Sequence, residues 1–124
     1  MSYEKLATLV NRLKVRTDKG EVTWTETASA GRYQAIVGDH TVVIDITPSD
    51  DGVSEDVRIT LLDESGDAVE QFTDESVKPW YEGPTDAYRQ MYSIYEVARR
   101  RALGTEQVVD SILDALDEKD EVPF

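Results

Sequence analysis

The chain contains no cysteine and a single histidine among its 124 residues. Without cysteine it can form no disulfide, no thiolate nucleophile and no cysteine-based zinc site. The one histidine, His40, has no second histidine or cysteine to join it as a metal ligand or as a catalytic partner. We therefore interpret His40 as a surface residue at the start of a strand.

Long apolar runs and catalytic signatures are also missing. No apolar segment approaches the ~20 residues that cross a bilayer, and the N-terminus lacks the apolar core of a signal peptide. There is no Gly-x-Ser-x-Gly elbow, and the glycines are scattered over turns instead of forming a phosphate loop. We expect a cytoplasmic protein with no membrane contact, no cofactor and no assignable catalytic or metal residue.

Lysine is scarce and acid is abundant. The chain has 26 Asp and Glu against 13 Lys and Arg, a net charge of −13. Such an excess keeps a protein soluble by self-repulsion, and it is tolerated best where salt screens it. Scarce lysine with abundant aspartate resembles the composition of halophilic archaeal proteins. This resemblance implies a cytoplasm of high salt concentration.

The acidity is uneven along the chain. Residues 1–48 are neutral overall, and residues 49–85 carry a net charge of −9. Residues 86–104 carry +2, and the last twenty residues carry −6. A basic strip is therefore possible within an acidic molecule.

Hydrophobic periodicity predicts the order of the elements. Apolar residues at helical spacing over 3–13 predict an N-terminal helix that ends near Gly20. Alternating β-branched and apolar residues then predict short strands, separated by turns. The strand segments are 22–25, 32–37, 40–47, 57–61 and, more weakly, 68–73. An irregular connector precedes a second helix, which Gly104 stops, and a third helix begins at Thr105.

This order predicts an α+β fold formed by one domain, residues 1–124. It consists of an N-terminal helix, an antiparallel β-meander of four to five strands, and two C-terminal helices packed on one sheet face. The last helix has an apolar stripe that would face the sheet. Its members are Val108, Val109, Ile112, Leu113 and Leu116.

The whole pattern resembles a family of small uncharacterised prokaryotic proteins, archaeal and bacterial, with a helix–β-meander–helix order. Because that family has no assigned activity, the resemblance implies a fold but no site residues. The stretch around Pro79 to Pro84 is longer here than in the family. The segments that carry the resemblance are 3–6, 16–20, Trp24, 33–35, 72–75 and 95–104.

Aromatic residues supply one group of candidate interaction residues. Trp80 and Tyr81 lie between two prolines in the irregular connector, where an exposed aromatic pair would suit a protein interface. Burial against a sheet edge is the alternative. Tyr88, Tyr92 and Tyr95 recur at helical spacing, which favours the core side of the second helix over a role in ligand stacking.

Charged residues supply the other candidates. Arg99, Arg100 and Arg101 stand near the C-terminus of the second helix, where cations complement the helix dipole. A contact with a partner or a phosphate is the alternative. The loop from Asp50 to Asp56 has the oxygen ligands that Ca²⁺ or Mg²⁺ prefers, but its spacing is not that of an EF-hand. Whether it binds a cation stays open at this point.

Three functions are compatible with these patterns. We favour a non-catalytic interaction module that forms a homodimer or binds a protein partner. A small-ligand binder or an enzyme that uses carboxylates is the first alternative. A nucleic-acid-associated protein that uses the arginine-rich helix end is the second, and the net charge of −13 disfavours it.

Overall fold

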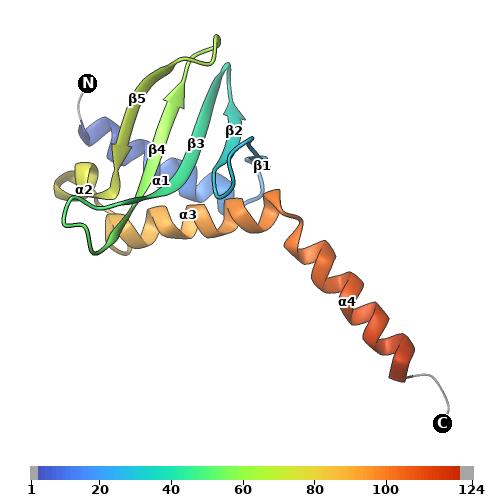
Figure 1. The fold of residues 1–124 in the computed structure, drawn as a ribbon. Helices are drawn as coiled ribbons and strands as arrows, with labels where there is room; N and C mark the ends of the chain where they lie inside the picture. The colour runs from blue at the N-terminus through green and yellow to red at the C-terminus, as the bar shows by residue number, and fades with distance from the viewer. Residues whose placement is uncertain (1–2, 121–124) are drawn as a thin grey trace.

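A five-stranded antiparallel sheet with the sequential order β1-β2-β3-β4-β5 forms one layer of the protein. The structure is a computed structural model that describes residues 3–120 (Figure 1). Short turns between neighbouring strands produce this meander, because antiparallel strands need no crossover connection. The strands are β1 (Thr25–Glu26), β2 (Tyr33–Val37), β3 (His40–Pro48), β4 (Glu55–Leu62) and β5 (Ala68–Thr73).

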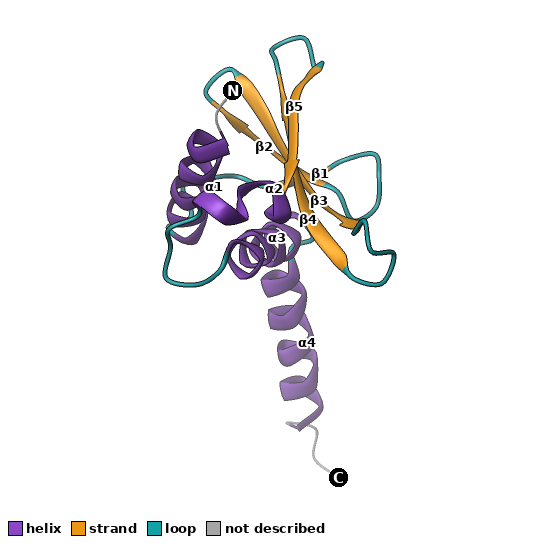
Figure 2. Ribbon diagram, turned by 90° about the vertical axis from the view of Figure 1, so that its left-hand side faces the viewer, coloured by secondary structure: helices purple, strands orange, loops and turns teal. Residues whose placement is uncertain are grey.

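Helices form the second layer. Figure 2 shows α1, α2 and α3 on one side of the sheet and none of them on the other. The long helices are α1 (Tyr3–Asp18), α3 (Ala87–Ala102) and α4 (Thr105–Asp120). The short helix α2 (Asp74–Val77) follows β5 directly and continues into one 3₁₀ turn (Lys78–Trp80).

The core lies between these layers. Along β3 and β4 every second side chain faces the helices, and Ile44 pairs across the strands with Ile59, which in turn pairs with Phe72. The inward stripe of α1 and the small residues of α3 complete it. The core members contributed by the helices include Leu6, Val10, Leu13, Met91, Ile94 and Ala98, none more than 6% exposed.

The predicted α+β class, with an N-terminal helix, a meander and two C-terminal helices, is confirmed. The first strand is shorter than the expected 22–25, since β1 contains only Thr25 and Glu26. Trp24 lies just before it and is buried, and its indole Nε1 donates to Thr17 Oγ1 at 3.3 Å. The segment that ends at Trp24 is therefore positioned by burial of its side chains, and strand pairing begins only at Thr25.

The tyrosines of α3 lie differently from the expectation. Met91 is fully buried, but Tyr88 and Tyr92 are 41% and 40% exposed. Their rings form a row with Tyr95, with centroids 5.8 to 6.0 Å apart. Small and aliphatic side chains occupy the centre of the helix face, because they let α3 approach the sheet closely, and the tyrosines are left at its margin.

The place of the last helix also needs correction. We expected both C-terminal helices on the sheet face, but only α3 lies there. Figure 1 shows α4 leaving the end of α3 and extending away from both layers. Every residue from 106 to 118 is exposed. The periodicity of α4 correctly indicates an apolar stripe, but no part of residues 3–120 covers it.

None of the helices within residues 3–120 is both long and apolar enough to cross a membrane.

Candidate functional site

The projecting helix α4 begins at a sharp change of chain direction. α3 ends at Ala102, and Gly104 adopts a positive φ of 66° before α4 starts at Thr105. Glycine adopts this left-handed conformation without the strain that a Cβ atom would add. The turn is closed by the Gly104 amide, which donates to the Arg101 carbonyl at 3.2 Å. The local sequence thus separates α4 from α3 and directs it outward.

The outward helix presents the apolar stripe to solvent. Its five members each keep between 48% and 54% of their surface exposed. They recur at spacings of three and four residues, so they share one face of the helix. Single exposed apolar residues are ordinary, but a continuous stripe on an isolated helix is typical of an interaction surface. We call this set the α4 stripe: Val108, Val109, Ile112, Leu113 and Leu116.

A groove of about 580 Å³ lies at the elbow where α3 meets α4. Val97 and Val109 form apolar parts of its wall, and Arg100 and Arg101 form basic parts. Glu106 and Asp110 line it from α4. The groove therefore continues the stripe toward the body of the protein and adds positive charge at that end.

The three candidate arginines have different environments. Arg99 is paired with Glu96 at 3.3 Å, and this pair raises the pKa of the Arg99 guanidinium. Arg101 Nη1 donates to the Thr17 carbonyl at the end of α1, at 2.5 Å. Arg100 is 66% exposed in its side chain and reaches Glu96 only at 4.0 Å. Arg101 therefore joins two helices, and the Arg100 side chain is more exposed than that of Arg99.

The two candidate aromatic residues, Trp80 and Tyr81, also have different environments. Trp80 is 46% exposed, and its ring stacks on Tyr3 with centroids 5.8 Å apart. Tyr81 packs against the core, and its hydroxyl is buried without a hydrogen-bond partner among the described residues. Burial, together with the charge of Asp86, raises the pKa of Tyr81. The two neighbours therefore do not form one exposed aromatic surface.

The acidic loop from Asp50 to Asp56 is ordered by its own hydrogen bonds. Asp51 Oδ1 accepts from the amides of Val53 and Ser54, both at 2.9 Å. These bonds lower the pKa of Asp51. They are the pattern of a self-stabilised turn, in which an aspartate accepts from the backbone two and three residues ahead. Among the residues that the structure describes, the carboxylates of this loop do not by themselves form a group close enough to share a cation.

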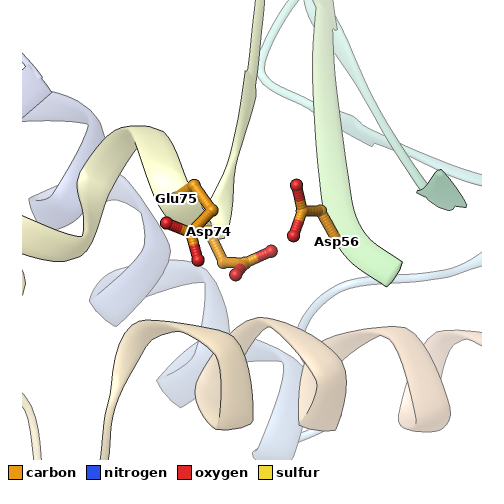
Figure 3. A group of neighbouring side chains, drawn as sticks. All are labelled: Asp56, Asp74 and Glu75. Atoms are coloured by element: carbon orange, nitrogen blue, oxygen red, sulfur yellow. The ribbon is translucent and has the colours of Figure 1, made fainter. Parts of the chain in front are cut away.

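Asp56 instead meets acids from a distant part of the chain. Figure 3 shows Asp56 on β4 facing Asp74 and Glu75 at the start of α2. Their carboxylate oxygens lie within 4.8 Å of one another, a spacing at which the three could hold a cation. Ser49 Oγ donates to Asp56 at 2.5 Å, and the Val57 amide donates to Asp74 at 2.8 Å. Two of the carboxylates thus already have structural roles.

Asp74 has an unusual electrostatic environment. Its side chain is buried, with 4% of the residue exposed. Burial raises the pKa of Asp74, and the nearby charges of Asp56 and Glu75 add to that rise, while the bond from the Val57 amide opposes it. A carboxyl group held in this way keeps its proton to a higher pH than an exposed carboxyl group does.

The sheet face opposite the helices carries a polar groove of about 710 Å³. Arg58 lies in it and is held by Asp45 on the neighbouring strand, through bonds of 3.0 and 2.6 Å. This bidentate pair raises the pKa of Arg58. Because Asp45 neutralises the charge of Arg58, the groove presents hydroxyls, amides and acids around an ion pair. His40, at the start of β3, is exposed and lies away from this groove.

Comparison with family models, with curated proteins and with solved structures found no match. The resemblance to the small prokaryotic family therefore stays a prediction. The residues that sequence reasoning missed are those of the α4 stripe. The sequence shows that these residues form an apolar stripe, but it predicts that the stripe packs on the sheet.

Proposed function

We propose that this protein is a non-catalytic module that self-associates through α4, and that it works in a cytoplasm of high salt concentration. One observation carries the proposal: a regular apolar stripe on a helix that projects from an otherwise complete fold. The core between α1, α3 and the sheet is filled without α4. The stripe is therefore not needed for folding of the domain, and its apolar character calls for another explanation.

The size of the stripe suits a reversible dimer. Burying a Val, Leu or Ile side chain completely contributes ~1.5–3 kcal/mol. The stripe has five half-exposed members on each copy, so pairing two stripes would contribute roughly 7–15 kcal/mol. Association costs on the order of 4–15 kcal/mol in lost freedom of motion. Since the two quantities are similar, we expect a dimer whose population depends on protein concentration.

The arginine run gives less support to nucleic-acid binding than its sequence suggested. Arg99 and Arg101 make contacts within the protein, and Arg100 lies 4.0 Å from Glu96 with its side chain 66% exposed. One such cation beside the acids of α4 is a poor site for a phosphate backbone, which is usually held by several. Self-association would use Arg100 without requiring the acids of α4 to lie beside a phosphate backbone.

The test replaces two stripe residues with glutamine, which keeps helix propensity. We expect Ile112→Gln with Leu116→Gln to be monomeric at concentrations where the unmodified protein is dimeric, by light scattering and sedimentation. Its midpoint of thermal unfolding should match that of the unmodified monomer, because these side chains pack on nothing in the fold. Ser111→Gln places the same side chain on the other side of α4 and should leave the dimer intact.

A protein that stays monomeric at every concentration from micromolar to millimolar would overturn the proposal. So would a double variant that dimerises as well as the unmodified chain.

A further inference from the structure

Basic and acidic residues are distributed unevenly along the segment that runs from the end of α3 through α4. Arg99, Arg100 and Arg101 stand at the elbow, and the bond from Arg101 to Thr17 brings the C-terminal end of α1, where Arg16 is paired with Glu21, to the same place. From there α4 extends with no lysine or arginine between residues 105 and 118. Its acids in that range are Glu106, Asp110, Asp114, Asp117 and Glu118. The elbow thus holds three arginines together with Glu106 and Asp110, and the far part of α4 carries more acids than bases, Lys119 being the one basic residue of the helix.

This polarity distinguishes the two ways in which α4 can pair with itself. A parallel pair would place the two arginine runs side by side and the two acidic ends side by side. An antiparallel pair would place the acidic end of each helix beside the elbow of the other. The antiparallel pair also sets the two helix dipoles in opposite directions, which is favourable. Charge complementarity therefore favours the antiparallel arrangement.

The spacing of the stripe is compatible with that orientation. A helix of 16 residues is about 24 Å long at 1.5 Å per residue. If two copies cross between Ile112 and Leu113, then Val109 of one copy lies against Leu116 of the other. Ile112 likewise lies against Leu113, so four of the five stripe residues meet one another as in a coiled coil, and Val108 lies against Asp117. The last turn of each helix then lies beside the elbow groove of the other copy, where Arg100 is accessible.

We infer that a second copy of this chain occupies the α4 stripe in antiparallel orientation, with its last-turn carboxylates facing Arg100. This inference rests on the proposed self-association and adds the orientation and the charged contact. The partner copy adds its acids to the elbow groove, where Arg100 lies with Glu106 and Asp110 and reaches Glu96 of its own chain only at 4.0 Å.

The absence of cysteine allows a direct test of orientation. Val109→Cys and Leu116→Cys are prepared separately and then oxidised alone and as an equal mixture. In an antiparallel dimer only the mixture gives an efficient disulfide between copies, and its product contains one chain of each kind by intact mass. Ile112→Cys, near the crossing point, should cross-link alone and shows that oxidation works. Ser111→Cys, on the other side of the helix, should not cross-link.

The outcomes separate this inference from the proposed function. Efficient cross-linking of Val109→Cys with itself, in a protein that light scattering shows to be a dimer, would establish a parallel pair and reject the orientation alone. A dimer in which neither the variants nor their mixture cross-link would reject the inference as well. A protein that is monomeric at all concentrations would reject the self-association on which it rests.

A charge exchange tests the contact of Arg100. At low salt, Arg100→Glu should weaken the dimer by about twofold to fivefold, the range of an exposed ion pair, and adding Asp117→Arg should restore it. Arg89→Glu makes the same charge change at the opposite end of α3 and should have a smaller effect. Equal weakening by the two glutamate variants, or no rescue by Asp117→Arg, would remove Arg100 from the interface.

Discussion

At the scale of single residues, Asp74 shows how the fold changes the chemistry of a side chain. It accepts a hydrogen bond from the Val57 amide and lies among other carboxylates. Its raised pKa means that the folded chain binds this proton more tightly than the unfolded chain. The stability that Asp74 contributes is therefore fully present below its ordinary pKa of about 3.9, and it is lost as pH rises through the higher pKa of the folded state.

We predict that Asp74→Asn raises the midpoint of thermal unfolding at pH 7. Asparagine keeps an oxygen to accept from Val57 but removes the buried charge near Asp56 and Glu75. The gain should shrink toward zero below a pH of about 3.9, where the aspartate is protonated in both states. Calorimetry across pH measures this dependence. Asp50→Asn, in the exposed loop, is the control and should change little. A variant less stable than the unmodified protein at pH 7 would contradict the prediction.

At the scale of elements, the ends of α1 and α3 are joined by Arg101. The C-terminal carbonyls of a helix lack partners within it, and the Thr17 carbonyl accepts both from the Gly20 amide at 3.0 Å and from the Arg101 guanidinium, whose charge complements the dipole. Thr17, whose carbonyl accepts this bond, also accepts from Trp24 through its hydroxyl. The contact therefore links α1, α3 and the segment before β1.

We predict that Arg101→Ala lowers the free energy of unfolding by about 1.5 kcal/mol, the lower end for a bond to a charged group, because Arg101 is exposed. Arg100→Ala should cost less than about 0.5 kcal/mol. Urea unfolding, at concentrations where the protein is monomeric, compares the two. Equal losses would show that the contact with Thr17 does not stabilise the fold. A larger loss of stability for Arg101→Ala than for Arg100→Ala would show that Arg101 stabilises the fold and that Arg100 does not.

At the scale of the whole molecule, the net charge of −13 opposes any dimer of this chain. The repulsion acts between all the acids of two copies. The attraction between Arg100 and the last-turn carboxylates of the other copy involves one site on each copy. The screening length falls from about 10 Å at 0.1 M salt to about 3 Å at 1 M. Salt should therefore remove more repulsion than attraction, and it leaves the apolar contact of the stripe in place.

We predict that dimerisation strengthens as potassium chloride is raised from about 0.1 M to about 1 M. Sedimentation equilibrium at each salt concentration measures the dissociation constant. The variant with Ile112→Gln and Leu116→Gln should stay monomeric throughout, which distinguishes specific pairing from aggregation caused by salt. A dissociation constant that rises with salt would show that attraction between charges, and not the stripe, holds the dimer.

The sequence by itself determined the strands, the three long helices, their order and most of the core, whereas the short helix α2 lies in the segment that the sequence presents as an irregular connector. The alternation in β3 and β4 and the stripe of α1 identify which side chains turn inward, because a period of two or 3.6 residues sets which residues share a face. Gly104 marks the end of α3 for a similarly local reason, since it must adopt a positive φ. These features depend on neighbours in the chain.

Only the tertiary structure decided what covers each face. An apolar stripe has the same periodicity whether it lies on a sheet or faces solvent, so the pattern of α4 could not reveal that the helix projects from the domain. Asp56 meets Asp74 and Glu75 because β5 returns the chain to β4, and no local spacing encodes that meeting. The separate roles of Arg100 and Arg101 likewise depend on where α1 ends in space.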